Sequence, residues 1–523
     1  MYMLKYLLVL NIIGFIYGQG GGYSLNISTT NYVDLGNILN FTYNDQLSIA
    51  YWFKVVSNEE IRISNRAACD NGSNSSGCHR GYSFLAGTDG LRFKLMNTWA
   101  NNMLVVIVSE SFDDNTWHYA VVTYDGSSDE SGVNIYLDNV LKSHSVHTNT
   151  LSATVVNSLP LRIGGNGEDS GGSGMIDEVR IWNDVRTVSE LQEYMHKEVA
   201  SDASGLVAYY KMSNGSGTSL TDNSSNSYTG TLTNMDNADW VTSYAPIGGL
   251  GSSYETDVEA VWKASGTSES DASDGLTMTM GSALSTGNFA VFGNNNTSSG
   301  STSDLGSVGS TYRTGRIWQV DESGTVTATI KIDMSDATGY ASNTGTASNY
   351  RLLYRSGTSG DFSSAATGSS ISGDVVTFNS FSLQDGYYAL GAESDASLPV
   401  ELTSFELMST REEGITLQWI TESEINNLGF ILDRRTPTTD WTQIASYITD
   451  QELQGQGSVS YQTIYTYTDN HVQENETYDY RLADVDHDGN VEYHSTQLMG
   501  VSISSTLPEQ YVLTKTIPTH SIQ

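Results

Sequence analysis

Positive charge, cysteine and proline are all scarce in this chain of 523 residues. It contains 24 Lys and Arg residues against 60 Asp and Glu residues, so its formal net charge is −36. This acidic excess argues against binding to nucleic acids or to anionic membranes, because both would repel the protein. It is typical of a soluble extracellular protein, and it supplies carboxylates of the kind that bind Ca²⁺.

Long amphipathic helical patterns are also missing, and only 6 residues are proline. Gly (50 residues) and Tyr (31 residues) are abundant, together with Ser, Thr and Asn. This composition favours short strands joined by many turns, because aromatic residues suit strands while Gly and Asn suit turns. A chain of this length is expected to form several domains rather than one core.

The N-terminal sequence MYMLKYLLVLNIIGFIYGQGGG has the features of a secretory signal peptide, predicted at residues 1–18. Lys5 supplies the positive charge, Leu7 to Ile16 form the apolar region, and Gly18 is a small residue suited to cleavage. A membrane anchor is the alternative, but the apolar run is short for a membrane span. No later segment is apolar enough to span a membrane.

The chain has two cysteines, Cys69 and Cys78, in the segment RAACDNGSNSSGCHRG. Two cysteines this close in an exported chain usually form a disulfide, and the polar, glycine-containing loop between them can bend back on itself. Closing the loop is expected to contribute about 2–3 kcal/mol. A metal site is the alternative, but only His79 is nearby as a further ligand.

Residues 19–243 form the first predicted domain. Segments such as LSIAYWFKVV and WHYAVVTYDG alternate apolar and other residues, which indicates strands of a two-sheet sandwich. Asp138 and Asn139 in GVNIYLDNVLKSHSV suit a two-residue hairpin turn. One short helix is predicted in RTVSELQEYMHKEV, with Thr187 or Ser189 as its N-cap.

These segments carry a family resemblance. YVDLGN, SIAYWFK, WHYAVVTYDG, VNIYLDN, LRIGG, GMIDEVRIWNDVRT and GLVAYYKM follow the order seen in LamG-like jellyroll domains. Those domains belong with the laminin-G, pentraxin and concanavalin-like sandwiches. The resemblance covers nearly the whole first domain, and GMIDEVRIWNDVRT is its most specific part.

Residues 254–395 are poorer in large apolar side chains. A disordered spacer is one reading, but Val326, Ala328, Ile330 and Ile332 alternate with polar residues as in a strand. We therefore expect a second β-sandwich, similar to β-modules found beside LamG-like domains in secreted bacterial proteins. The Gly/Ser linker at Gly248 to Ser253 predicts that the first two domains move independently.

Residues 398–503 resemble the fibronectin-III-like module that precedes type IX secretion sorting signals, most clearly in WITESEINNLGFILDRR. Trp419 would be its core tryptophan, and Tyr478 and Tyr480 would lie on the strand that ends at Arg481. The tail LPEQYVLTKTIPTHSIQ matches a type IX sorting domain through Thr514. Deleting one base from a suitable coding sequence of the usual motif reproduces the remaining residues, so 504–523 is predicted to be a frameshifted remnant.

Two acidic segments invite a calcium interpretation. In LamG-like relatives an acidic residue in GMIDEVRIW joins a structural Ca²⁺ site, which implies Asp177 here; a simple hydrogen-bonding role is the alternative. The segment DVDHDGNVE (484–492) has the beginning of an EF-hand loop, but its twelfth position is Ser495 rather than a carboxylate. A hairpin turn at Asp488-Gly489 is therefore expected.

Catalytic motifs find no match in the chain. The neighbouring carboxylates of Asp177 and Glu178 are expected on opposite faces of a strand, whereas glycosidases need two facing carboxylates. Trp99, between polar residues in LMNTWANN, is the candidate for stacking on a sugar ring. Trp52, Trp117 and Trp182 lie in strand motifs and are expected in the core.

We therefore expect an all-β protein, with a LamG-like jellyroll sandwich followed by two further β-sandwich modules. Its expected function is a secreted or cell-surface binding or adhesion protein, not an enzyme, that recognises an extracellular glycan or protein ligand. A divergent glycosidase and a purely structural surface module are the alternatives. The resemblance places the protein outside a bacterium or on its surface, or in the periplasm if the frameshift is real, with no membrane span after signal cleavage.

Overall fold

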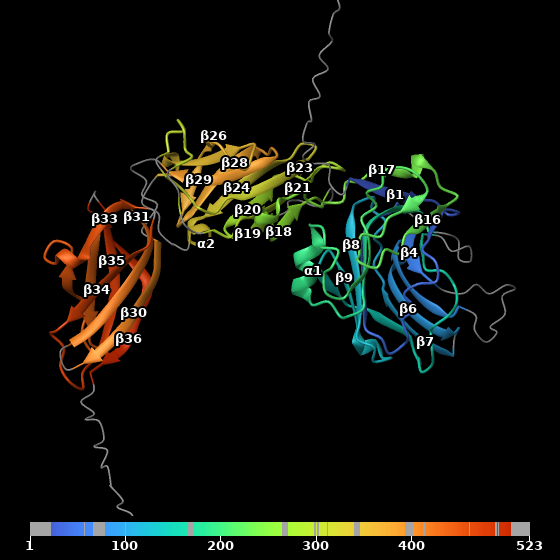
Figure 1. The fold of residues 1–523 in the computed structure, drawn as a ribbon, viewed down its shortest axis with the longest axis horizontal. Helices are drawn as coiled ribbons and strands as arrows, with labels where there is room; N and C mark the ends of the chain where they lie inside the picture. Colours follow the sequence, from blue (N-terminus) through green and yellow to red (C-terminus); the bar gives the residue numbers. More distant parts are fainter. Residues whose placement is uncertain are drawn as a thin grey trace, which may run out of the picture.

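The computed structural model describes residues 22–503, apart from 57, 66–78, 100, 165–171, 264–269, 298–299, 301–302, 311, 339–345, 393–400, 412–413, 460, 487–488 and 490. It shows three β-rich units that follow one another along the chain (Figure 1). The predicted all-β fold class is confirmed. The predicted signal peptide, the two cysteines and the sorting-domain remnant lie outside the described residues.

Two sheets pack face to face in the first unit. The first sheet runs in the order β10 (Val140–Lys142), β9 (Val133–Leu137), β8 (His118–Tyr124), β3 (Leu47–Lys54), β13 (Gly174–Trp182), β1 (Tyr23–Ile27) and β17 (Trp240–Thr242), with β14 (Leu206–Tyr210) also paired to β13. The second sheet runs in the order β11 (Ser145–Asn149), β7 (Asn102–Val108), β6 (Gly90–Thr98), β5 (Gly81–Gly87), β4 (Glu60–Ser64), β12 (Arg162–Gly164), β2 (Tyr32–Asp34), β16 (Gly230–Thr233) and β15 (Ser219–Leu220).

The inner faces of these sheets form one hydrophobic core. Alternate residues of each strand point inward, as the period of two requires. The core takes Ile49 and Tyr51 from β3, Phe84 from β5 and Phe93 from β6, all fully buried. The hairpin predicted at Asp138-Asn139 joins β9 to β10, and both turn residues have positive φ (49° and 61°).

The outer face of the first sheet carries the predicted helix, α1 (Val188–Met195). Thr187 is its N-cap and forms a capping box with Glu190, one of the two caps that the sequence allowed. Trp52 donates its Nε1–H to the carbonyl of Met195 at 3.1 Å, which fixes the helix against the sheet. Trp52, Trp117 and Trp182 are buried as predicted, but beneath this outer layer rather than between the sheets.

The middle unit is also a two-sheet sandwich, so the prediction of ordered strands there is confirmed. One sheet has the order β18 (Thr256–Val261), β21 (Phe289–Asn294), β23 (Trp318–Ser323), β29 (Gly386–Ala392), β25 (Tyr350–Arg355) and β26 (Ser363–Thr367), with β22 (Tyr312–Arg313) paired to β29. The other has the order β19 (Ser270–Ser273), β20 (Leu276–Met280), β24 (Thr327–Asp333), β28 (Val375–Ser382) and β27 (Ser370–Ser372), and α2 (Met334–Thr338) follows β24. Ala328, Ile330 and Ile332 alternate into the core between the sheets, as their spacing predicts.

The third unit is built around β31 (Gly414–Arg435), which pairs with β30 (Glu401–Arg411), β32 (Thr442–Ser446), β33 (Gln454–Val459), β34 (Thr463–Asp469) and β35 (Thr477–Asp486); β36 (Val491–Ser502) pairs with β35. Trp419 is fully buried at its centre and stacks on Tyr465 with ring centroids 5.5 Å apart. The prediction that the strand of Tyr478 and Tyr480 ends at Arg481 is wrong, because β35 continues to Asp486. Short 3₁₀ helices lie at Glu130–Gly132, Asn237–Asp239, Ser252–Tyr254, Ala347–Asn349 and Gln451–Leu453.

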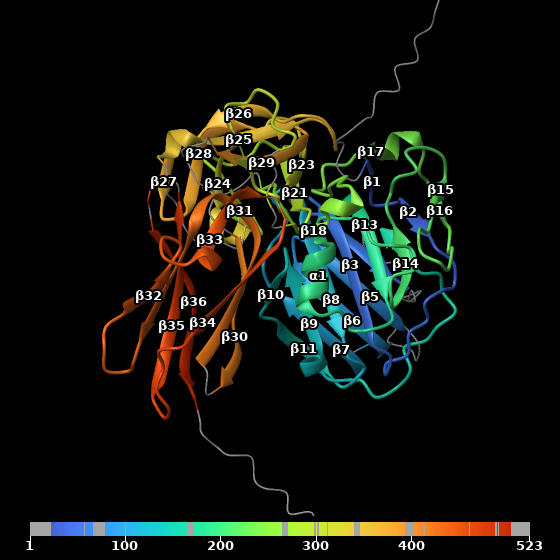
Figure 2. The ribbon, with the colours of Figure 1, turned by 60° about the vertical axis from the view of Figure 1, so that its left-hand side comes forward.

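The linker between the first two units is hydrogen-bonded to both of them, although its composition predicts that they move independently. The Gly248 N–H donates to the carbonyl of His196 in the first unit, at 2.9 Å. Only three residues later, the Gly251 N–H donates to Gln319 Oε1 in the middle unit, at 2.8 Å. Both views of the ribbon place β18 beside α1 (Figure 2), and Gln192 of α1 donates a hydrogen bond to Glu259 of β18 at 3.3 Å.

Candidate functional site: an acidic pocket at one end of the first unit

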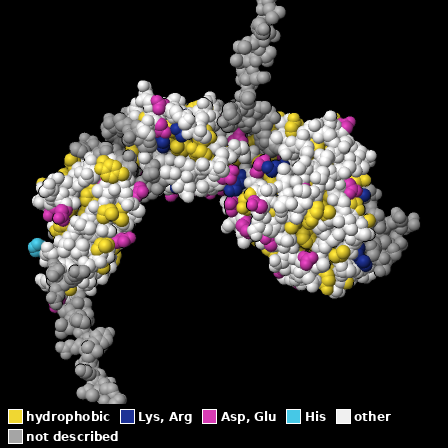
Figure 3. All heavy atoms as spheres, viewed as in Figure 1, with side chains coloured by type: hydrophobic (Ala, Val, Ile, Leu, Met, Phe, Trp, Pro, Cys, Tyr) yellow, Lys and Arg dark blue, Asp and Glu magenta, His cyan; other side chains and the backbone are white. Residues whose placement is uncertain are grey.

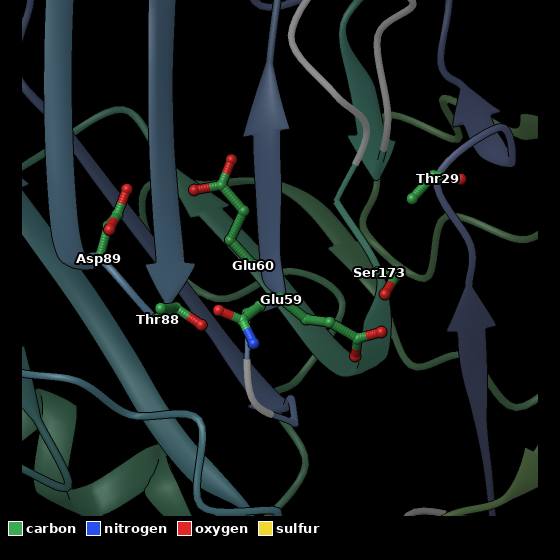
Figure 4. A pocket seen from close by; sticks show the side chains of 7 residues that line it. Thr29, Glu59, Glu60, Thr88, Asp89 and Ser173 are labelled. Carbon is green, nitrogen blue, oxygen red and sulfur yellow. The ribbon is translucent and has the colours of Figure 1, made fainter.

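A cavity of about 430 Å³ opens at one end of the first sandwich. Its lining comes from four separate chain segments: the β1–β2 loop, the residues that lead into β4, the β5–β6 turn and the residue before β13. Figure 4 shows Glu60 and Asp89 extending toward the same side, while Glu59 extends toward Ser173. All the lining residues are polar, and three of them are acidic: Thr29, Asn58, Glu59, Glu60, Thr88, Asp89 and Ser173.

Tight turns bring these residues together. Gly87 pairs with Gly90 across the β5–β6 turn, so Thr88 and Asp89 occupy its tip. Gly90 has a φ of 90°, and a Cβ there would lie 1.8 Å from the carbonyl oxygen of Val108, so only glycine fits. The Thr88 N–H donates to the carbonyl of Glu59 at 2.9 Å, which joins the turn to the start of β4.

The Asp113 carboxylate hydrogen-bonds to two of the residues that line the pocket, Thr88 and Asn58. Its Oδ2 accepts hydrogen bonds from Thr88 Oγ1 at 2.8 Å and from the Asn58 N–H at 3.2 Å. Hydrogen bonds from Ser111 and Thr88 lower the pKa of the Asp113 carboxyl. The ionised carboxylate therefore fixes the positions of Asn58 and Thr88 around the cavity.

Two arginines from the outer face of the second sheet hold two of the pocket's carboxylates. Arg62, which is 2% exposed, forms an ion pair with Glu60 across alternate positions of β4. Arg92 of β6 forms an ion pair with Asp89 at 2.5 Å. Glu60 is thus oriented by a charge-assisted hydrogen bond from Arg62, and Asp89 by the charge of Arg92.

His118 anchors the chain that follows Asp113. Its Nδ1–H donates to Asp138 at 2.8 Å, and its Nε2–H donates to Asp114 at 3.3 Å. Burial lowers the pKa of His118, but hydrogen bonds and charges from Asp114 and Asp138 outweigh that effect and raise it to about 9. The imidazolium therefore clamps the 113–118 segment to the β9–β10 turn at neutral pH.

Asp177, the predicted calcium ligand, lies elsewhere and is completely buried. Its carboxylate accepts hydrogen bonds from the Ser243 hydroxyl and, at 2.8 Å, from the Glu178 N–H. Burial and the neighbouring Glu178 charge raise the pKa of the Asp177 carboxyl well above its usual range. Among the described residues, no group of three or more His, Cys, Asp or Glu side chains is placed to hold a metal ion. The calcium site stays a prediction, while the hydrogen bonds tie β13 to the chain after β17.

The expectation that Asp177 and Glu178 point to opposite faces of a strand is wrong. Ile176 and Val179 both belong to the inner core, so two residues instead of one separate them. The register of β13 against β3 shifts at this point, and Glu178 has a φ of 51°. This bulge turns Glu178 to the outer side, where it pairs with Arg180 and accepts a hydrogen bond from the Tyr209 hydroxyl.

Trp99, the predicted sugar-stacking residue, is 38% exposed beyond the end of β6, and its ring lies 5.2 Å from that of His79. Asp89 precedes the other end of β6. Because β6 has nine residues, about 30 Å of strand separates Trp99 from the pocket. The structure therefore does not bring the aromatic candidate and the acidic pocket into one site. Cys69 and Cys78 lie outside the described residues, so their disulfide stays a prediction.

No sequence pattern singles out the residues that line the pocket. The nearest signals in the sequence are the SNEE and TDG turns, which are polar and flank strands, but nothing in the sequence connects them. Of the helices in the described part of the chain, none has the length and apolar character that a membrane crossing requires.

The two packed sheets of the first unit form a concanavalin-like β-sandwich. Residues 28–192 match the concanavalin A-like lectin/glucanases superfamily, which confirms the class assigned to the first unit. Residues 252–387 match a domain of unknown function (DUF8202). No curated protein matches the chain by sequence.

Three solved structures are similar in part. A protein from Bacteroides ovatus, described as a candidate carbohydrate-binding protein, is 18% identical over 43% of this chain and 61% of its own, with a TM-score of 0.31. A CBM40 module of the Ruminococcus gnavus IT-sialidase, bound to α2,3-sialyllactose, is 13% identical over 28% of this chain and 80% of its own (TM-score 0.21). Domains LG4–5 of the mouse laminin α1 chain are 9% identical over 72% of this chain and 80% of their own (TM-score 0.22). At these identities and TM-scores, none of the three says which ligand this chain binds.

Proposed function

We propose that this protein is a non-catalytic carbohydrate-binding protein of the bacterial exterior, and that the acidic pocket of its first unit receives the sugar. The observation that carries the proposal is the pocket itself. Its lining of carboxylates, hydroxyls and one amide sits on a sandwich whose family includes lectins. A volume of about 430 Å³ lies in the range of small-molecule pockets, which is about 300–1,000 Å³.

The chemistry of the lining suits a polyhydroxylated ligand. A sugar hydroxyl both donates and accepts hydrogen bonds, so it pairs with carboxylates as a donor and with Thr88 or Ser173 in either sense. Within the described part of the chain, Glu59 forms no ion pair with an arginine, in contrast to Glu60 and Asp89. We therefore expect Glu59 to accept a hydrogen bond from the ligand.

The negative charge of the pocket also selects among glycans. Three carboxylates line one small cavity of a protein whose formal net charge is −36. A glycan with carboxylate or sulfate groups would be repelled, because like charges at short range disfavour binding. The proposed ligand is therefore a neutral glycan.

Binding is favoured over hydrolysis by the way in which the carboxylates are held. A glycosidase needs one carboxylic acid that donates a proton and a second, facing carboxylate. Glu60 and Asp89 are instead paired with Arg62 and Arg92, which supports a role as hydrogen-bond acceptors. Release of reducing sugar from any polysaccharide by the purified chain would overturn this part of the proposal.

A glycan array with the purified full chain tests the proposal, using neutral and acidic glycans side by side, with Ca²⁺ and with a chelator. We expect retention of neutral glycans that Glu59→Gln and Ser173→Ala weaken. Asp202→Asn removes an exposed carboxylate of the same unit outside the pocket and should bind like the wild type. Retention of acidic glycans alone, or equal binding by the pocket variants, would contradict the assignment.

A further inference from the structure

The outer face of the first sheet carries a second, aromatic surface that the glycan pocket does not use. It includes Trp52, Trp117 and Tyr119, all at most 4% exposed, together with Tyr209 and with Leu191 and Met195 of α1. In a sandwich of two sheets, the outer faces usually meet water and carry polar residues. A buried aromatic layer on an outer face therefore needs a partner that covers it.

Helix α1 covers one part of this surface, and the linker covers another. Ala245 and Ile247 are buried in the same aromatic cluster. The His196 Nδ1–H donates to the carbonyl of Pro246 at 2.9 Å, and the carbonyl of His196 accepts from the Gly248 N–H at 2.9 Å. His196 therefore binds the linker twice, once through its ring and once through its backbone carbonyl.

The same linker is bound to the middle unit by its next residues. The Gly249 N–H donates to Asp321 at 2.5 Å, and Leu250 packs against Val291 in an apolar cluster on the outer face of the middle unit. A Cβ on Gly248 would lie 2.6 Å from a methyl group of Val291. Glycine at this position thus permits close approach of the two units rather than flexibility.

Trp262, at the end of β18, completes the cover. Its Nε1–H donates to the carbonyl of Trp117 at 3.2 Å. Its ring lies 4.9 Å from that of His196 and meets the ring of Trp52 edge-on at 5.8 Å. The Trp262 ring therefore reaches from the middle unit into the aromatic surface of the first unit. Buried tryptophan contacts of this kind contribute much of the binding energy of an interface.

Polar contacts surround this aromatic centre. The Lys197 Nζ donates to the carbonyl of Glu255 at 3.2 Å, and Gln192 Nε2 donates to Glu259 Oε1 at 3.3 Å. Figure 3 shows charged side chains of both signs gathered where the first two units meet. An apolar centre within a polar rim is the arrangement of a specific interface.

We propose that the function of the middle unit is to cover the aromatic outer face of the first unit, and that Trp262 locks the two into one rigid body. The structure thereby gives a role to the domain of unknown function at residues 252–387. The two units unfold together, and the first unit presents its pocket in one fixed orientation relative to the middle unit. This proposal does not depend on glycan binding.

Calorimetry of the full chain tests the lock. We expect one transition for the first two units together and a second for the third unit. Trp262→Ala should split the joint transition in two and should expose the linker to cleavage by a glutamate-specific protease at Glu255. The matched control is Trp441→Ala, which removes a tryptophan that contacts Arg435 and Arg481 of the third unit and should leave the joint transition whole.

A second variant keeps the test decisive if Trp262→Ala does not fold. Gly248→Val forces the linker away from Val291 without changing the core between the sheets of either unit, so it should produce the same splitting and the same cleavage. Separate transitions for the first two units in the wild type would overturn the proposal. The proposal would also be overturned if both variants kept the joint transition and the protease resistance of the wild type.

Discussion

The clamp at His118 should make the stability of the protein depend on pH in a defined window. Its pKa is about 9 in the folded protein, against an ordinary value of 6.5. Because the folded value is the higher one, the stabilisation is fully present below pH 6.5 and is lost as the pH rises through 9. At about 1.4 kcal/mol per pKa unit, the shift corresponds to a contribution on the order of 3 kcal/mol.

The measurement is urea-induced unfolding of the full chain and of His118→Gln at pH 6 and at pH 10. Glutamine cannot take up the proton, so the variant reports every other titrating group and the difference isolates His118. We expect the variant to be less stable than the wild type at pH 6, and this deficit to shrink by about 3 kcal/mol at pH 10. A deficit that is the same at both pH values, or that grows with pH, would refute the assignment of a charged clamp.

Three further substitutions have expected outcomes that follow from local geometry. Gly90→Ala should cost about 2 kcal/mol or more, because its φ is 90° and the new Cβ would meet Val108; Gly281→Ala, with nothing within 4 Å of its Cβ, is the control in the same thermal unfolding assay. Trp419→Ala should destabilise the third unit by about 3–5 kcal/mol, since the ring is fully buried, and should leave the other calorimetric transition unchanged. Glu424→Gln should cost about 1–3 kcal/mol of unfolding free energy. The buried Glu424 carboxylate accepts four hydrogen bonds, and the glutamine amide would turn its NH₂ group toward two of the four donors. A change below about 0.5 kcal/mol in urea unfolding, the level of an ordinary surface substitution, would contradict this expectation.

Much of the fold could be predicted because apolar and polar residues alternate along a half-buried strand, and this alternation is visible in the sequence. The alternation from Ala328 to Ile332 predicts a half-buried strand, and β24 is one. The hairpin at Asp138-Asn139 was predictable from its two turn residues, and the core position of Trp419 followed from the resemblance of its segment to a fibronectin-III-like module. Each of these features depends on residues that are close together in the sequence.

The features that could not be predicted depend on residues far apart or on one extra residue in a strand. The pocket joins Thr29, Glu60, Asp89 and Ser173 from four segments, and its polar turns have no periodic pattern. The bulge at Glu178 adds a residue that alternation cannot reveal. The Gly-rich linker suggests flexibility by composition, but its glycines serve close contact between two units, which only the packed structure shows.

Titration calorimetry with the neutral glycan that binds best on the array is the direct test of the proposed glycan site. We expect Glu59→Gln to weaken the affinity by about tenfold or more, because losing a hydrogen bond to a charged group costs about 1.5–3 kcal/mol. Asp202→Asn and Trp99→Ala should bind with the affinity of the wild type, because both positions lie outside the pocket. Unchanged affinity for Glu59→Gln, together with loss of binding in Trp99→Ala, would show that the glycan binds at the other end of β6 instead.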